Sequence, residues 1–243
     1  MSAPKIAIVA ALEREVSPII KHWRSEEREH DGRKFKCFEN HRAVLVCGGI
    51  GKDAARRATE AVIFLYQPMA VISAGFAGAL DPKLKAGAAV SVRKIIDAAD
   101  GSSQNFDGPG FTLITASEVA GVGQKEKLAT AYAGHAVDME AAAVARGAQK
   151  HGVRFQAFKA ISDELDFEFP RMQDFITYDG RFQAVRFAAF ALLRPWLWPK
   201  LIQLARNSEK ATRTLCDWLD QYNHPAEKLE NPAAGMHPIA RGR

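Results

Sequence analysis

The chain has 243 residues, of which 47% are hydrophobic and 25% are charged. This length and balance suit one domain with a sizeable core and exclude a largely disordered protein. The net charge of +5 comes from Lys and Arg residues spread among acids, not gathered in a basic run with aromatics, so we expect no nucleic-acid partner.

The cysteines and the amino terminus indicate a cytoplasmic protein. Cys37, Cys47 and Cys216 are odd in number and lack C-x-x-C spacing, which argues against a disulfide framework and a zinc site. The apolar run from Lys5 to Leu12 is short, and charged residues follow it without a cleavage site, so it is not a convincing secretory signal. No apolar stretch reaches the roughly 20 residues that span a bilayer, so we expect no integral membrane segment.

The first part of the chain predicts two strand–helix units. The expected elements are a strand over Lys5–Leu12, a helix over Glu13–Trp23, a strand over Arg42–Cys47 and, after the segment GGIGK at 48–52, an Ala-rich helix ending near Tyr66. The first strand therefore delivers three residues, Glu13 to Glu15, to a strand–helix turn.

A third unit follows, with another cluster of glycines. Ala70–Ser73 is strand-like and leads into AGFAGAL at 74–80, and Gly87–Ile96 predicts a further strand. Glycines after strands let backbone N–H groups approach a phosphate, a ribose or a carbonyl. Neither cluster matches a P-loop or a dinucleotide fingerprint, and tight turns alone would also explain both.

The segment 136–166 places carboxylates where a helix begins and a strand ends. Glu140 opens an Ala-rich helix that runs to about Gly152, and an apolar strand follows from Phe155 to Ile161. Ser162 and Asp163 lie at the carboxyl end of that strand, where ligands of open α/β sheets bind. A structural alternative stays open, because such residues also cap helices and complement the helix dipole.

Five segments, taken in order, are specific as a set. They are AALEREV at 10–16, GGIGK at 48–52, SAGFAGAL at 73–80, AVDMEAAAVA at 136–145 and KAISDELD at 159–166. Over residues 5 to about 166 the chain resembles the purine nucleoside and uridine phosphorylase superfamily, and within it the methylthioadenosine/S-adenosylhomocysteine nucleosidases. The resemblance implies a three-layer α/β fold with a central, mixed, partly barrel-like sheet and helices on both sides.

The resemblance also implies roles for individual residues. Asp163 would donate a proton to N7 of a purine, or stabilise a proton there, as a carboxyl kept protonated by burial and by the nearby Glu164 and Asp166. Glu140 would bind the ribose hydroxyls and favour the oxocarbenium-like sugar. The remaining expected contacts are with Met139 against the sugar, Ser162 positioning Asp163, and the main chain near Ile50 and Ala77.

Glu15 bears on whether water or phosphate attacks the sugar. In the nucleosidases that the chain resembles, the matching glutamate activates water, whereas the phosphorylases gather arginines around phosphate. An anionic Glu15 would repel phosphate, and the segment lacks a G-D-P-x-R type signature, so we expect a hydrolase. Phosphorolysis is the alternative, since Arg14 is adjacent, although both residues could equally be solvated in a first helical turn.

Several aromatic residues depart from the nucleosidase pattern. Phe76 stands where a small residue is usual, and it could narrow the site, stack on a base or belong to the core. Phe106 and Phe111 are candidates for the aromatic segment that stacks on adenine. His135 precedes the acidic helix, and a lone histidine there is more often structural than functional.

The carboxyl-terminal third predicts an apolar helix, a Pro-Trp-Leu-Trp-Pro corner and an amphipathic helix over 187–219. This part resembles phosphorylase-like proteins associated with hopanoid synthesis, which act on adenosylhopane. The resemblance leaves room for an apolar channel or peripheral membrane contact, although core packing or a dimer interface is the more usual use of Trp196 and Trp198. We expect a domain over 1–222 and a flexible tail over 223–243.

The sequence thus predicts an N-ribosyl hydrolase of an adenine nucleoside that is methylthioadenosine-like, S-adenosylhomocysteine-like or adenosylhopane-like. A phosphate-dependent phosphorylase and a non-catalytic nucleoside-binding protein remain the alternatives. No metal or organic cofactor is implied, and the resemblance suggests a homodimer that binds a small-molecule nucleoside.

Overall fold

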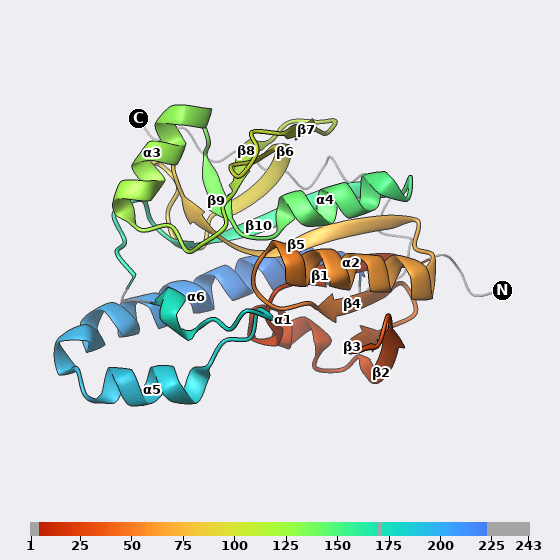
Figure 1. The fold of residues 1–243 in the computed structure, drawn as a ribbon, viewed down its shortest axis with the longest axis horizontal. Coiled ribbons are helices and arrows are strands. Elements are labelled where there is room, and N and C mark those ends of the chain that lie inside the picture. Colours follow the sequence, from red (N-terminus) through yellow and green to blue (C-terminus); the bar gives the residue numbers. More distant parts are fainter. Residues whose placement is uncertain (1–4, 170–171, 223–243) are drawn as a thin grey trace.

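Ten β-strands form one mixed sheet at the centre of the computed structural model, which describes residues 5–169 and 172–222 (Figure 1). The strands are β1 (Ile6–Ala10), β2 (Arg24–His30), β3 (Arg33–Glu39), β4 (Ala43–Cys47), β5 (Ala70–Ala79), β6 (Ala89–Asp97), β7 (Ser103–Asn105), β8 (Phe111–Thr115), β9 (Ala136–Asp138) and β10 (Arg154–Asp163). The helices are α1 (Glu13–Ile20), α2 (Lys52–Tyr66), α3 (Val122–Tyr132), α4 (Ala141–Lys150), α5 (Ala184–Leu192) and α6 (Trp198–Leu219). Short 3₁₀ turns cover Met172–Phe175, Pro195–Leu197 and Asp220–Tyr222.

The sheet closes on itself at one end. Its strand order is β10-β6-β8-β9-β5-β1-β4-β3-β2, and β10 also pairs with β5, so five strands complete a small barrel. β5 joins the two parts, because its first residues pair with β1 and its last two with β9. The predicted three-layer fold with a mixed, partly barrel-like sheet is therefore confirmed.

Alternation along the buried strands separates two cores. In β1, Ile8 and Ala10 face α1 and α6, whereas Ala7 and Val9 face α2 and α4 on the other side of the sheet. This follows from the period of two in a β-strand, which sends successive side chains to opposite faces. Since β1, β4, β5 and β10 run parallel, their carboxyl ends meet at one edge of the sheet.

Most predicted elements are present with shifted ends, but one predicted segment differs, and a hairpin is present where no element was predicted. The glycine-rich segment 74–80, expected as a ligand-binding turn, continues the strand as the second half of β5. The residues between the first helix and the second strand, for which the sequence made no prediction, form the hairpin β2–β3, whose β2 is highly charged and largely exposed.

The carboxyl-terminal helices form as predicted, but only part of them packs on the body. α6 buries side chains from Asn207 onward, and α5 buries none, so α5 and the start of α6 extend away from the sheet (Figure 1). Trp196 is 70% exposed and Trp198 is 46% exposed, so of the two expected uses core packing is wrong, and the dimer interface stays a prediction. Among the described helices, none is long and apolar enough to cross a bilayer. The tail over 223–243 lies outside the described residues.

Candidate active site

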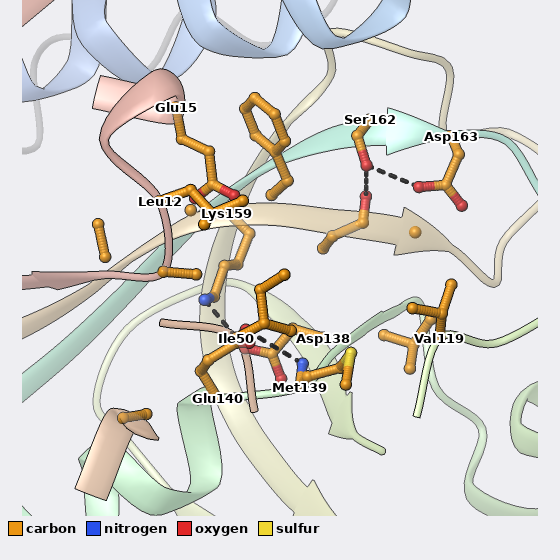
Figure 2. A pocket seen from close by; sticks show the side chains of 18 of the residues that line it. Leu12, Glu15, Ile50, Val119, Asp138, Met139, Glu140, Lys159, Ser162 and Asp163 are labelled. Carbon is orange, nitrogen blue, oxygen red and sulfur yellow. Dashed lines mark hydrogen bonds and ion pairs between the residues drawn. The ribbon is translucent and has the colours of Figure 1, made fainter. Parts of the chain in front are cut away.

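A cavity of about 160 Å³ lies where the parallel strands end, and eight of the residues that the sequence singled out for the site line it (Figure 2). These residues are Glu15, Ile50, Phe76, Ala77, Met139, Glu140, Ser162 and Asp163. They come from the first turn of α1, the loop before α2, the middle of β5, the junction of β9 and α4, and the end of β10. The sheet topology thus brings together residues up to 148 positions apart in the sequence.

Glu15 places a buried carboxyl in the cavity wall. Its side chain lies in the first turn of α1, immediately after β1, and the residue is only 6% exposed. Among the described residues, Glu15 Oε2 and Ser73 Oγ are the buried side-chain polar atoms that have no hydrogen-bond partner. A buried polar atom without a partner is unfavourable, so both atoms favour a polar group entering the cavity.

Burial also changes the protonation of Glu15. Desolvation, reinforced by the negative charge of Glu140, raises the pKa of Glu15 to about 8, and the nearby Lys159 opposes this rise. A carboxyl with this pKa is mostly protonated at pH 7. A neutral Glu15 repels phosphate less than an anion does, which weakens the electrostatic argument made from the sequence against phosphorolysis.

Glu140 lies immediately before α4, and its carboxylate bonds to the main chain. Oε1 accepts a hydrogen bond of 2.7 Å from the N–H of Gly51, so a glycine of the GGIGK segment orients a carboxylate. Burial and the charge of Asp138 raise the pKa of Glu140 to about 7. Glu140 is the N-cap residue of α4, but its side chain does not cap the helix; Asp138 Oδ2 instead accepts a hydrogen bond of 2.8 Å from the N–H of Ala141.

Lys159 supplies the positive charge of this cluster. Its Nζ lies 2.9 Å from Asp138 Oδ2, and both side chains are almost completely buried (Figure 2). Burial alone would lower the pKa of Lys159, but Asp138, Glu140 and Glu15 together raise it. Neither Asp138 nor Lys159 was predicted from the sequence, although Asp138 stands within the VDMEAAAVA segment and Lys159 is the one charged residue between Phe155 and Ile161.

Asp163 lies at the far end of the cavity from this cluster and has its own cation. Its Oδ2 is 2.5 Å from Lys125 Nζ, which also donates a 2.6 Å hydrogen bond to the carbonyl oxygen of Glu164. Its Oδ1 accepts a hydrogen bond of 2.6 Å from Ser162 Oγ. The Lys125 and Asp163 side chains are 1% and 4% exposed, so this is a buried ion pair.

The expected surroundings of Asp163 are therefore wrong in one respect. Glu164 turns its carboxylate outward to Lys85, at 2.8 Å, and Asp166 is exposed. The nearest charge to Asp163 is thus a cation and not a second carboxylate. Lys125 comes from α3, in a region where the sequence offered no motif, and nothing in its spacing marks it as buried.

Two glycines of β5 make room for the carboxylates. A Cβ on Gly75 would lie 3.0 Å from Glu15 Oε2, and a Cβ on Gly78 would lie 2.7 Å from Asp163 Oδ2. The glycines expected to admit a ligand's phosphate or carbonyl therefore admit side chains of the protein itself.

Aromatic side chains line the cavity, but two of the predicted ones do not. The predicted adenine-stacking candidates Phe106 and Phe111 lie elsewhere, with Phe106 packed against Phe155 at 4.8 Å and Phe111 against His135 at 5.5 Å. The cavity is instead lined by Phe76, as expected, and by Phe169 and Phe182.

His135 and Arg14 also have defined surroundings. His135 Nδ1 accepts a hydrogen bond from the N–H of Thr112, a structural role. Arg14 is exposed but borders the cavity, with its guanidinium 5.4 Å from the ring centre of Phe182.

Comparison with known proteins agrees with this architecture. The 5'-methylthioadenosine/S-adenosylhomocysteine nucleosidase of Marinomonas sp. is 34% identical over 95 residues, which cover 37% of this chain and 41% of the relative. The aminodeoxyfutalosine nucleosidase of Campylobacter jejuni is 30% identical over 86 residues, which cover 34% of this chain and 38% of the relative. The matched segment thus spans about two fifths of the length of these relatives.

Solved structures match over nearly the whole chain. The Helicobacter pylori 5'-methylthioadenosine/S-adenosyl homocysteine nucleosidase, complexed with a substituted pyrrolidin-3-ol, superposes with a TM-score of 0.66 at 19% identity, covering 92% of this chain and 99% of that one. The futalosine hydrolase of the same organism superposes with a TM-score of 0.64 at 19% identity, covering 90% of this chain and 97% of that one. At such identity the likeness concerns the fold. The sequence profile of the phosphorylase superfamily matches residues 5–122 and 109–195, and the chain therefore belongs to the phosphorylase superfamily.

Proposed function

We propose that this protein is an N-ribosyl hydrolase that cleaves the glycosidic bond of an adenine nucleoside. The observation that carries the proposal is one cavity lined by Glu15, Glu140 and Asp163, with an unpaired carboxyl oxygen on Glu15. The names of the relatives, nucleosidases for methylthioadenosine, S-adenosylhomocysteine and aminodeoxyfutalosine, support an adenine nucleoside as substrate.

In the proposed reaction, Asp163 faces N7 of the base. Lys125 and Asp163 form a buried ion pair, and a proton of the Lys125 ammonium passes through the Asp163 carboxyl to N7. The Asp163 carboxylate then accepts a hydrogen bond from the protonated N7. The electron pair of the breaking bond between C1′ and the base moves onto the adenine, where the proton at N7 neutralises it. This charge complementarity exists only as the bond breaks, so it accelerates the chemical step.

Glu140 and Glu15 act on the sugar. Glu140 accepts hydrogen bonds from the ribose hydroxyls, and its negative charge favours the oxocarbenium-like sugar. Glu15, in its ionised form, takes a proton from water as the water oxygen bonds to C1′, and Ser73 Oγ offers a second polar contact to that water. Products are free adenine and a sugar with a hydroxyl at C1′.

Phosphorolysis is the alternative. Two of the cations that line the cavity, Lys125 and Lys159, already pair with carboxylates at 2.5 and 2.9 Å. Arg14 lies over the ring of Phe182. This distribution differs from the cluster of free arginines that a phosphate dianion requires, and it favours water as the nucleophile.

The test is to measure, by chromatography, the adenine released from methylthioadenosine and S-adenosylhomocysteine. We expect turnover by the wild type and a loss of about 10²–10⁴-fold in Asp163→Asn, the range for removing one acid–base group. Asp166→Asn, an exposed carboxylate three residues along the chain, is the matched control and should keep full activity. Calorimetric binding of these nucleosides without any adenine release would replace the proposal with a nucleoside-binding protein.

A second candidate substrate, with a larger 5′ substituent, is an adenosylhopane-like lipid nucleoside. The described residues of the segment between β10 and α5 contribute apolar side chains to the cavity wall, namely Phe169, Met172, Ile176 and Phe182. An apolar wall of this kind accommodates an alkyl chain better than the zwitterion of S-adenosylhomocysteine. A higher kcat/KM for a long 5′-alkylthioadenosine than for methylthioadenosine supports the lipid-linked substrate, and the reverse order supports a small thioether.

We also propose that the protein works in the cytoplasm as a homodimer. The three cysteines are unpaired thiols, which is typical of a reducing compartment. The dimer rests on the family resemblance, and sedimentation equilibrium of the full chain tests it. A monomer at micromolar concentration would contradict it.

A further inference from the structure

One end of the molecule exposes an unusual concentration of apolar side chains. We define the α5–α6 tip as residues 184–206, that is, α5, the Pro-Trp-Leu-Trp-Pro corner and the first part of α6, which extend from the body (Figure 1). Of the nine large hydrophobic residues that are exposed in the described part of the chain, six belong to this tip. They are Val185, Leu192, Leu193, Trp196, Trp198 and Ile202.

The tip is built as a defined element. Phe175, Phe182, Phe187 and Phe190 form a cluster beneath it, with ring centres 5.1 to 5.4 Å apart for the closer pairs. Trp198 Nε1 donates a 3.0 Å hydrogen bond to the carbonyl oxygen of Ala191, which fixes the corner against α5. The phenylalanines thus form a small core of their own, and the leucines and tryptophans remain outside it.

The charged residues of this region are all basic. Residues 180–208 contain five basic residues and no acidic one, leaving the rest of the chain with 28 of each sign. The net charge of the whole protein therefore resides in this stretch. Arg186, Lys200 and Arg206 are exposed, Arg194 lies 4.0 Å from the ring centre of Phe190, and Arg181 pairs with Asp179 just outside the stretch.

We propose that the α5–α6 tip docks on the surface of a bilayer that contains anionic lipid. Trp, Leu and Val side chains beside Arg and Lys are the composition of an interfacial amphipathic element, whose rings lie at headgroup level while its cations contact lipid phosphates. A second copy of the chain fits less well, because a two-fold contact through the tip would bring two equally positive surfaces together.

The docking would also orient the candidate active site. The tip follows Phe182 in the chain, and Phe182 lines the cavity. A tip at the membrane therefore places the apolar wall of the cavity close to the lipid surface. The proposal stands on the surface of the tip and not on the nucleosidase activity, so the two can fail separately.

The experiment is flotation of the full chain with vesicles of phosphatidylcholine, with and without phosphatidylglycerol. We expect the wild type to float only with phosphatidylglycerol, and to be released by high salt. Trp196→Glu should abolish flotation, and Lys200→Gln should lower the partition coefficient roughly fivefold, as for the loss of one cation near an anionic surface. Phe64→Glu is the matched control, since Phe64 is also 70% exposed but lies on α2.

Each other outcome contradicts the proposal. A wild type that does not float with phosphatidylglycerol vesicles, or Trp196→Glu floating as the wild type does, excludes docking through the tip. If Trp196→Glu converts a dimer into a monomer and vesicles bind neither, the tip is an interface between copies of this chain. Circular dichroism and unchanged nucleoside turnover of Trp196→Glu show that the variant is folded.

Discussion

At the scale of single residues, the site depends on two buried ion pairs that the sequence did not reveal. Lys125 pairs with Asp163, and Lys159 pairs with Asp138, each with almost no solvent exposure. Removing one partner of such a pair leaves an uncompensated charge in the interior, which is strongly destabilising, whereas removing both is much less so. The pairs therefore make stability and function inseparable at these positions.

The first prediction concerns Lys125 and Asp163 as a coupled pair. We expect Lys125→Met to lower the free energy of unfolding by about 3 kcal/mol, the range for a broken buried pair. Adding Asp163→Asn to this variant should recover more than half of the loss, because the unpaired carboxylate disappears. Urea unfolding of both single variants and the double variant measures the coupling. Additive effects would show that the two side chains are energetically independent.

The second prediction concerns the raised pKa of Glu15. The folded pKa of about 8 exceeds the ordinary value of 4.5, so the native state keeps a proton that the unfolded chain releases. Glu15 therefore lowers the stability progressively as the pH rises from about 4.5 to about 8, and the loss is complete above that window. We expect Glu15→Gln to be more stable than the wild type at high pH and nearly equal to it at the low end.

Melting temperatures of the wild type and Glu15→Gln across this pH window test the prediction. A gain of at most about 5 kcal/mol at the alkaline end is expected, since about 1.4 kcal/mol accompanies each pKa unit between 4.5 and about 8. Glu13→Gln, an exposed carboxylate at the start of the same helix, is the control and should show no such trend. A stability gain of Glu15→Gln that is independent of pH would contradict the buried, protonated carboxyl.

At the scale of elements, β5 decides where the carboxylates can lie. Gly78 leaves the space that Asp163 Oδ2 occupies, since a Cβ there would approach to 2.7 Å. We expect Gly78→Ala to displace Asp163 and reduce kcat by at least about 10²-fold, as a displacement of about 1 Å can do. Gly123→Ala in α3, where a Cβ meets nothing within 4 Å, is the matched control and should keep normal activity. Normal turnover in Gly78→Ala would show that Asp163 has freedom to move.

The same strand shows which features of the site the sequence predicts and which it does not. Apolar runs and the VDMEAAAVA and AISD segments predicted the strands and helices that hold Glu15, Glu140 and Asp163, because hydrophobic periodicity and turn chemistry are local signals. Strand pairing is not local. That Gly75 and Gly78 continue β5, and that Lys125 of α3 reaches Asp163, depends on contacts between distant segments. The prediction that Phe106 or Phe111 stacks on adenine was wrong for the same reason, since the presence of an aromatic residue does not show on which face of the sheet its ring lies.

In the molecule as a whole, three parallel strands, one strand–helix junction and the segment that leads into α5 meet around one cavity. The sheet topology gathers the carboxylates at one edge, and the segment leading into α5 gives the cavity an apolar wall. A nucleoside whose base and ribose face the carboxylates, with an apolar 5′ substituent against that wall, uses every feature of this arrangement.

The identity of the sugar product distinguishes hydrolysis of the glycosidic bond from phosphorolysis. Purified protein is incubated with methylthioadenosine or a long 5′-alkylthioadenosine, with and without phosphate, and the sugar is identified by mass spectrometry. Hydrolysis predicts free adenine and an unphosphorylated 5-substituted ribose at rates that do not depend on phosphate. Strict dependence on phosphate, with a ribose 1-phosphate product, would contradict the account and assign the cavity to phosphorolysis.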